Sequence, residues 1–181
     1  MVFYHSISKF VWDKAKKCKL LALDVDGVLT DGKVYYNGSS ADSKPFFVRD
    51  GLGLVLLQQQ GIQIAVISGR ADPGVDKRVK ELQINYYYPG VKDKLAVWDE
   101  LLERAKLKAS ECAYIGDDLI DLPILVRVGF AVTVQNAHPC VTNYCHYTTH
   151  SQGGAGAVRE VCDIILYAQD KFESVIDSFL S

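Results

Sequence analysis

The sequence predicts an α/β domain built on a doubly wound, mostly parallel sheet with helices on both faces. Short apolar runs, typical of buried strands, alternate with segments whose apolar residues recur at helical spacing. Acidic or glycine-containing motifs follow several of these runs, at the strand ends where such sheets bind ligands. The 181 residues fit one domain, so we expect a single domain over residues 1–181.

The expected elements alternate along the chain. A short amphipathic helix within residues 1–19 precedes the first strand. Later strands are expected at β-branched or aromatic runs, and helices where apolar residues recur every three or four positions. The expected strands cover residues 20–25, 62–67, 86–88, 112–115 and 130–134, and the expected helices cover 51–60, 73–82, 95–105, roughly 119–128, and 157–168.

Two segments lie outside this alternation. Residues 33–36, Asn37-Gly38 and residues 46–48 predict a β-hairpin flap over about 32–50, which should overhang the carboxyl end of the sheet. The tail over about 169–181 repeats apolar residues on one helical face. A lone domain has little to bury either set against, so both predict contacts between subunits. The apolar tail residues are Phe172, Val175, Ile176, Phe179 and Leu180.

The composition argues against several functions. With 20 Lys+Arg and 22 Asp+Glu, the net charge of −2 disfavours broad binding to nucleic acid or to an anionic membrane. No apolar run approaches the ~20 residues of a membrane-spanning helix, and the first 19 residues lack the apolar core of a signal peptide. The five cysteines form no Cys-x-x-Cys pair. We therefore expect reduced thiols and a cytoplasmic protein.

The first expected strand ends in two carboxylates, Asp24 and Asp26, followed by Gly27. Side chains at positions i and i+2 of an extended segment point the same way. Two close negative charges need a cation or a shared proton. An Asp-Gly turn after a buried strand is the alternative explanation and, for this motif alone, an equally good one.

Three further strand ends carry polar motifs. A hydroxyl, backbone amides and a guanidinium suit a phosphate, a lysine can neutralise a phosphoryl oxygen, and clustered acids predict a cation. Taken singly, a solvated Arg or Lys explains the first two motifs better, and the last acid could cap a helix. The residues are Ser68, Gly69 and Arg70 after the second strand, Lys94 after the third, and Asp117, Asp118 and Asp121 after the fourth.

Taken together and in this order, the four motifs resemble those of the haloacid dehalogenase superfamily of phosphohydrolases, over essentially the whole chain. The resemblance implies that Asp24 is a nucleophile that forms an aspartyl-phosphate and that Asp26 is the general acid. It implies Mg²⁺ held by Asp24, the backbone carbonyl of Asp26, and Asp117, with Asp118 and Asp121 in support. The implied contacts to phosphate or substrate come from Thr30, Arg49, Ser68, Gly69, Arg70 and Lys94.

The spacing leaves no room for a cap domain between Asp31 and Gly51 or between Arg70 and Lys94. The chain is similar to the capless branch, and within it to phosphatases of 3-deoxy-D-manno-octulosonate 8-phosphate in lipopolysaccharide precursor synthesis. This resemblance also rests on residues 48–53, 137–139 and 153–160, although Ala155 stands where relatives often have a basic residue. It implies a small phosphorylated sugar-acid substrate, whose carboxylate suits Arg49 and Arg70. It also implies a homotetramer in which a neighbour completes the open site.

Other functions stay open at this point. Phosphatases of nonulosonate 9-phosphates share the capless design, and an inactive relative could serve as an oligomerisation module. Residues 86–88 could stack on nucleic acid, but the chain has no basic stripe. A zinc site is also conceivable, although its spacing fits no common zinc motif. Its ligands would come from His138, Cys140, Cys145, His146 and His150.

Overall fold

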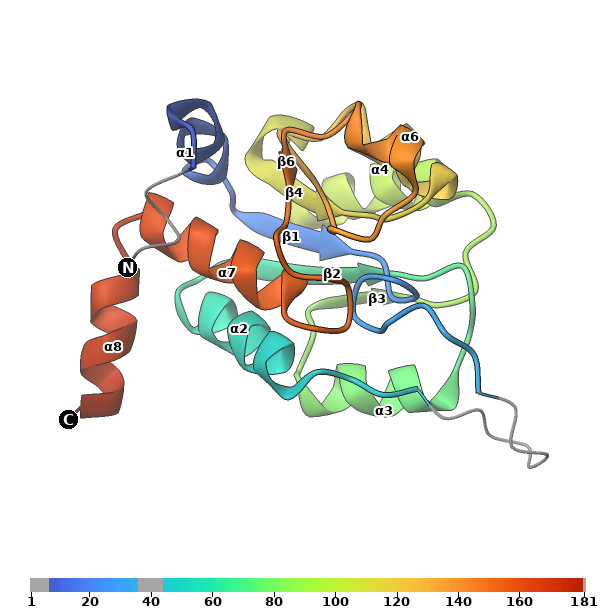
Figure 1. Cartoon of the computed structure of the whole chain (residues 1–181), viewed down its shortest axis with the longest axis horizontal. Helices are drawn as coiled ribbons and strands as arrows, with labels where there is room; N and C mark the ends of the chain where they lie inside the picture. The colour runs from blue at the N-terminus through green and yellow to red at the C-terminus, as the bar shows by residue number, and fades with distance from the viewer. Residues whose placement is uncertain (1–6, 36–43, 181) are drawn as a thin grey trace.

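One sheet of six parallel strands forms the centre of the computed structural model, which describes residues 7–35 and 44–180. The strand order is β3-β2-β1-β4-β5-β6, so the order reverses between β1 and β4 (Figure 1). This confirms the predicted doubly wound fold. The strands are β1 (Leu20–Leu23), β2 (Gln63–Ile67), β3 (Tyr86–Tyr88), β4 (Cys112–Ile115), β5 (Phe130–Thr133) and β6 (Tyr147–Thr148).

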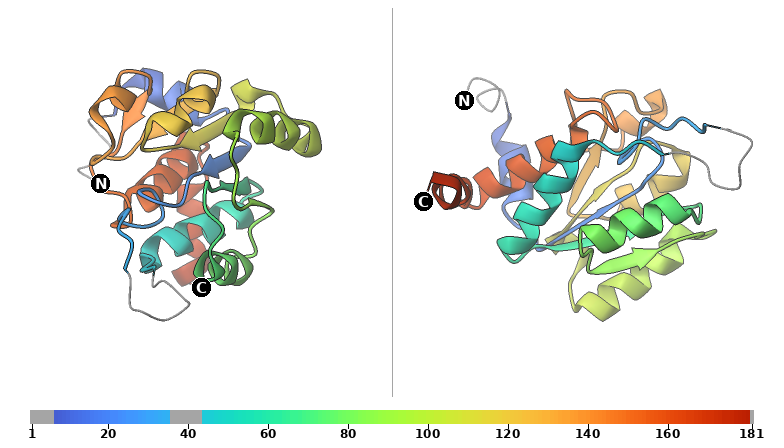
Figure 2. Two further views of the ribbon diagram at one scale, coloured as in Figure 1. Left: turned by 90° about the vertical axis from the view of Figure 1, so that its right-hand side faces the viewer. Right: turned by 90° about the horizontal axis from the view of Figure 1, so that it is seen from below.

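Helices cover both faces of this sheet (Figure 2). Alternate strand residues face opposite sides: Leu21 and Leu23 pack with α1, α2, α3 and α7, whereas Leu20 and Ala22 pack with α4 and α5. Because both faces are buried, β1 is apolar throughout. The helices are α1 (Lys9–Ala15), α2 (Val48–Gln59), α3 (Pro73–Glu81), α4 (Lys94–Ala105), α5 (Leu122–Leu125), α6 (Pro139–Thr142), α7 (Ala157–Ala168) and α8 (Phe172–Leu180).

The register of the sheet brings the ends of β1 and β4 together. Leu23 pairs with Ile115, so the residues that follow each strand leave the sheet side by side. The Asp24 amide continues the ladder by donating to the Ile115 carbonyl at 3.0 Å. The crevice where the strand order reverses is the usual ligand site of such sheets, and the chain fills it with acids.

The segment before α2 differs from the prediction. Val48 is the first residue of α2 and Phe46 has no strand partner, so the expected strand over 46–48 is wrong and the helix begins earlier than residue 51. The misleading signal was the apolar run over 46–48, which resembled a hairpin strand. Gly51 and Gly53 lie inside α2, and side chains from α3 and α7 pack directly on the helix backbone there. The rest of the predicted flap, residues 36–43, lies outside the described residues.

Three smaller differences concern short elements. A 3-10 turn over Leu119–Asp121 precedes α5, so the expected helix over 119–128 is shorter than its apolar pattern suggested. The two-residue strand β6 and the one-turn helix α6 are too short to leave a periodic signal. None of the described helices combines the length and apolar character needed to cross a bilayer.

Candidate active site

Three carboxylates converge where β1 and β4 end. Asp24, Asp117 and Asp121 each place an oxygen so that all three oxygens lie within 4.8 Å of one another. Asp24 is 5% exposed and Asp121 is fully buried, whereas Asp117 is partly exposed. Carboxylate oxygens at this spacing suit a hard divalent cation such as Mg²⁺.

Lys94 lies between two of these acids. Its Nζ is 2.9 Å from Asp24 Oδ1 and 2.7 Å from Asp121 Oδ1. The side chain of Asp93 accepts bonds from the amides of Leu95 and Ala96, which fixes the start of α4 and hence the root of Lys94. Three carboxylates and one ammonium leave a formal charge of −2, which one divalent cation would balance.

The pKa values of Asp24, Asp117 and Lys94 are all shifted by burial and by the neighbouring charges. Burial raises the pKa of Asp24 to about 6, although the Lys94 charge works against the rise. Burial also raises the pKa of Asp117 to about 7, and the neighbouring Asp24 and Asp121 charges add to this effect. For Lys94, burial alone would lower the pKa, but the two carboxylates outweigh it and the pKa is raised. A bound cation would lower both aspartate pKa values.

Asp121 organises the loop that follows β4. Its Oδ1 accepts from Lys94 Nζ and from the buried Tyr114 hydroxyl, each at 2.7 Å. Its Oδ2 accepts from the amides of Asp117 at 3.0 Å and Asp118 at 3.3 Å. A Cβ on Gly116 would overlap the Asp121 side chain, so only glycine fits beneath it. The Asp118 side chain points to its own turn and accepts from the Leu119 amide at 2.7 Å.

Asp26 is held by a residue that no sequence motif indicated. Lys44 Nζ lies 2.6 Å from Asp26 Oδ1 and 3.7 Å from Asp72 Oδ2. The Lys44 side chain is 1% exposed, whereas that of Asp26 is 27% exposed. Lys44 fell within the predicted flap, and Asp72 caps α3 through its Oδ1. Neither position is part of a periodic pattern, so sequence reasoning missed both.

The turn after β1 is braced from within. Thr30 Oγ1 donates to the Val25 carbonyl at 3.3 Å and accepts from the amides of Gly27 and Gly32 at 3.4 and 3.3 Å. The Thr30 hydroxyl is therefore engaged in shaping the loop. Gly27 has a φ of +95°, and a Cβ there would overlap the Asp117 carboxylate. This glycine permits the close approach of the two acidic loops.

Ser68 closes a tight turn after β2. It is 1% exposed; its Oγ donates to the Arg70 carbonyl at 2.9 Å and accepts from the Arg70 amide at 3.2 Å. The Arg70 side chain is exposed. Within the described residues, no hydrogen bond or ion pair links Ser68, Gly69 or Arg70 to the acid cluster.

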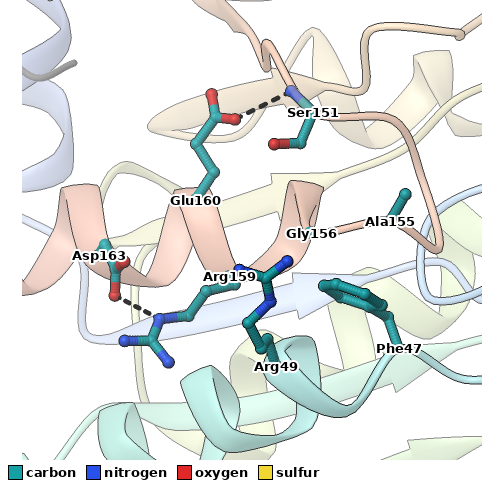
Figure 3. A pocket seen from close by; sticks show the side chains of 8 residues that line it. All are labelled: Phe47, Arg49, Ser151, Ala155, Gly156, Arg159, Glu160 and Asp163. Atoms are coloured by element: carbon teal, nitrogen blue, oxygen red, sulfur yellow. Dashed lines mark hydrogen bonds and ion pairs between the residues drawn. The ribbon is translucent and has the colours of Figure 1, made fainter.

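Arg49 lies instead in a pocket of about 260 Å³ between α2 and the start of α7 (Figure 3). Its guanidinium stacks over the Phe47 ring, 4.9 Å from the centroid. Across the pocket, Arg159 Nε donates to Asp163 Oδ1 at 2.7 Å. The pocket is lined by Phe47, Arg49, Ser151, Ala155, Gly156, Arg159, Glu160 and Asp163.

Two of the histidines considered as zinc ligands have structural roles. His146 Nδ1 accepts from the Ala131 amide at 2.8 Å, and His138 Nδ1 accepts from the Cys140 amide at 3.3 Å. The only group of at least three potential metal ligands found in the described part of the chain is the aspartate cluster.

Comparison with known proteins gives consistent matches. Residues 88–161 match the family of haloacid dehalogenase-like hydrolases. The 3-deoxy-D-manno-octulosonate 8-phosphate phosphatase of Yersinia pestis is 44% identical over 170 residues, which cover 94% of this chain and 91% of that protein.

Solved structures agree. The phosphatase of the same name from Moraxella catarrhalis, in complex with magnesium, phosphate and KDO, superposes with a TM-score of 0.91 at 45% identity, covering 93% of this chain and 97% of its own. The cobalt-bound deoxy-D-mannose-octulosonate 8-phosphate phosphatase of Haemophilus influenzae gives 0.83 at 40% identity, with 87% and 92% covered.

Proposed function

The chain belongs to the haloacid dehalogenase-like hydrolases, and from this premise we propose that it is a divalent-metal-dependent phosphatase that converts 3-deoxy-D-manno-octulosonate 8-phosphate to the free sugar acid and phosphate. The observation that carries the proposal is the cluster of Asp24, Asp117 and Asp121 with Lys94 in the crevice between β1 and β4. A catalytically inactive module would have no need for buried, mutually repelling carboxylates.

In the proposed mechanism, Asp24 is the nucleophile. Lys94 contacts its Oδ1, which leaves Oδ2 to attack phosphorus. The bond between phosphorus and the sugar oxygen breaks, and Asp26 gives its proton to that oxygen. Asp26 then takes a proton from water as the water attacks phosphorus, which breaks the aspartyl-phosphate bond and restores Asp24. Two steps through a covalent intermediate replace one difficult displacement.

The metal site follows from the same cluster. The Asp24 and Asp117 side chains and the Asp26 backbone carbonyl would hold Mg²⁺. Asp121, which contacts Lys94, would support the site. Asp118 would contribute through the turn that it caps. When bound, Mg²⁺ supplies the positive charge that lets a carboxylate approach a phosphate dianion.

The remaining predicted contacts fall into two groups. Lys94, Ser68 and the Gly69 amide are proposed to bind phosphoryl oxygens, while Thr30 acts through the loop that its hydroxyl braces. Arg70 is exposed beside the β2 turn and Arg49 lines the pocket of Figure 3. Both are proposed to attract the carboxylate of the sugar acid, because guanidinium groups match carboxylates well.

We further propose a single cytoplasmic domain that assembles as a homotetramer. Several large apolar side chains are exposed on the subunit, including Val48 at 78%, Phe179 at 65% and Leu180 at 80%. In Figures 1 and 2, α8 lies at the opposite end of the molecule from the carboxyl ends of the strands. α8 therefore does not cover the site of its own subunit, and we propose that it contacts a neighbouring subunit. Light scattering on the purified protein would give the mass directly.

A substrate panel tests the proposed function. Phosphate release is measured with 3-deoxy-D-manno-octulosonate 8-phosphate, a nonulosonate 9-phosphate and glucose 6-phosphate, each with Mg²⁺ and after chelation. We expect the highest kcat/KM for the eight-carbon acid, no activity after chelation, and none in Asp24→Asn. A higher kcat/KM for the nine-carbon acid would show that the proposed eight-carbon substrate is wrong. If none of the three phosphate esters were hydrolysed, the proposal that the protein is a phosphatase would be refuted.

A further inference from the structure

The ion pair between the buried Lys44 side chain and the partly exposed Asp26 has no part in the mechanism above. The Lys44 ammonium is 2.6 Å from Asp26 Oδ1 and its side chain is 1% exposed. Lysine is almost never fully buried unless it is paired, because removing the ammonium from water is costly. The chain nevertheless places this lysine against a carboxyl group that is proposed to carry the reaction's proton.

Asp72 anchors this lysine from the other side. Its Oδ1 accepts from the amides of Gly74 at 2.8 Å and Val75 at 3.1 Å, so the carboxylate is fixed at the first turn of α3. Its Oδ2 faces Lys44 Nζ at 3.7 Å. Lys44 thus lies between the fixed carboxylate of Asp72 and the more exposed carboxylate of Asp26. In this arrangement, the position of Asp72 determines where Lys44 holds Asp26.

The Asp26 side chain depends on this contact. Lys44 is its only hydrogen-bond partner among residues 7–35 and 44–180. The arrangement parallels that of the nucleophile, where Lys94 contacts Asp24 through Oδ1. In each pair a lysine binds Oδ1 and leaves Oδ2 for chemistry. A protonated carboxyl group can keep this contact, because Oδ1 still accepts while Oδ2 carries the proton.

We propose that Lys44 is a positioning residue that aims Asp26 Oδ2 at the leaving oxygen of the substrate. The inference rests on the proposed function of Asp26 as general acid. A proton donor must lie within hydrogen-bond reach of the oxygen it protonates, and a carboxyl group with no other fixed contact would rotate away from that position.

The inference predicts a loss that depends on the leaving group. A sugar alkoxide leaves poorly without a proton, whereas p-nitrophenolate is stable as an anion and needs little help. In Lys44→Met we expect the rate of the first step, measured as release of the leaving group within one turnover, to fall about tenfold or more for the sugar phosphate, within the range that general acids contribute. For p-nitrophenyl phosphate we expect the rate of this step to change less than about twofold. The second step, in which Asp26 takes a proton from water, is common to both substrates and is left out of this comparison. Asp26→Asn should show the same pattern, more strongly.

Single-turnover kinetics of leaving-group release from the full-length protein test this with both substrates at saturating Mg²⁺. Lys80→Met serves as the matched control, because Lys80 is exposed on α3. The double variant Asp26→Asn/Lys44→Met should be no slower than Asp26→Asn alone, since Lys44 acts only through Asp26. Asp72→Asn keeps the oxygen that caps α3, and it should cause a smaller loss that is again confined to the sugar phosphate. If circular dichroism shows that Lys44→Met does not fold, the Asp72→Asn variant tests the inference in its place.

Three results would overturn the inference. Equal losses with both substrates would assign Lys44 to folding or to substrate binding. If the loss of rate in the double variant equalled the product of the losses in the two single variants, Lys44 would not act through Asp26. If the first-step rate of Asp26→Asn shows no dependence on the leaving group, the proposed role of Asp26 as general acid fails and this inference fails with it.

Discussion

At the scale of single residues, the site depends on carboxylates that are each fixed by a particular donor. Lys94 holds Asp24, Lys44 holds Asp26, and the Asp117 and Asp118 amides meet Asp121. The partners are specific because an unpaired buried charge costs several kcal/mol. A change of one atom in such a group should therefore affect both stability and metal binding.

Asp121→Asn is the sharpest stability test at this scale. The new amide group would face donors on whichever side it turned, because Lys94 and Tyr114 bind one oxygen and two backbone amides bind the other. We expect the free energy of unfolding to fall by about 2–4 kcal/mol, measured by urea denaturation. Asp99→Asn, an exposed position on α4, is the control and should change little. A loss below about 0.5 kcal/mol would show that these bonds are not important for stability.

Sequence reasoning found the acidic residues and Lys94, but not Lys44, the partner of Asp26. Asp24, Lys94, Asp117 and Asp121 lie together as expected, because neighbouring parallel strands bring their carboxyl ends to one edge. The engagement of Lys44 with Asp26 depends on how a non-periodic segment folds back over the site. No spacing in the sequence encodes that path, so this contact could not be predicted.

At the scale of elements, α2 and α7 are linked through Asp50. The Asp50 carboxylate accepts from the amides of Gly156 at 3.3 Å and Arg159 at 2.7 Å. Gly156 precedes α7 and offers no side chain of its own as a cap, so a residue of another helix supplies the acceptor. The glycine-rich loop before α7 also packs on the turn after β1, where the Gly154 amide donates to the Val28 carbonyl at 2.9 Å.

Asp50→Ala should therefore destabilise the protein and loosen this loop. Two partly buried amides lose their acceptor, and the expected loss is about 1–3 kcal/mol in the free energy of unfolding. Hydrogen exchange of the Gly156 and Arg159 amides should accelerate in parallel. Gln59→Ala, exposed on the same helix, is the control. Unchanged exchange at these two amides would contradict the proposed cap.

The tail helix gives a test of assembly. Val175 of α8 is buried, and the ring of Phe172 stacks on Tyr167 at 3.9 Å, so α8 packs partly on its own subunit. Phe179 and Leu180 remain exposed. We expect Phe179→Ser/Leu180→Ser to lower the mass measured by light scattering, because these side chains are proposed to lie at the interface. Val126→Ser, another exposed apolar position, should leave the mass unchanged. A full-sized assembly in the double variant would exclude these two residues from the interface.

Most elements were predictable because their apolar pattern repeats over many residues. The exceptions have local causes. The apolar run over 46–48 resembled a strand, but α2 begins at Val48. Gly51 and Gly53 within α2 accommodate Arg78 and Arg159, and tertiary packing of this kind leaves no mark on periodicity. The two-residue β6 and the four-residue α6 are too short to show a period.

At the scale of the whole molecule, the doubly wound sheet concentrates negative charge at one edge. The chain carries a net charge of only −2, so the unbalanced charge is local to the crevice. The fold and the class of chemistry were predictable from motifs at strand ends. The proposed preference for an eight-carbon acid rests on similarity to named relatives, since no single contact among residues 7–35 and 44–180 indicates the length of the sugar.

Buried acids should make the metal-free protein less stable as the pH rises. Burial raises the pKa of Asp24 and of Asp50 to about 6 and that of Asp117 to about 7. These groups bind protons more tightly in the folded state, so the free energy of unfolding falls between about pH 4 and pH 7. His146, whose pKa is lowered by burial, acts in the opposite sense but is a single group.

Urea denaturation with chelator at pH 5, 6 and 7.5 measures this effect. We expect a fall of at least about 2 kcal/mol, since one unit of pKa shift corresponds to about 1.4 kcal/mol. Added Mg²⁺ should reverse the fall at pH 7.5 in the parent protein but not in Asp117→Asn. Stability that rises with pH in the absence of metal would contradict the pKa shifts and the argument for a cation.

Trapping the covalent intermediate tests the central claim most directly. The protein is mixed with Mg²⁺ and 3-deoxy-D-manno-octulosonate 8-phosphate that is radiolabelled in its phosphate. The reaction is stopped with acid within one turnover, and borohydride then reduces any aspartyl-phosphate to homoserine. We predict labelled protein before reduction, homoserine at position 24 by peptide mapping, and neither in Asp24→Asn. Free phosphate released without labelled protein, or homoserine at any other position, would contradict the assignment of Asp24 and the mechanism built on it.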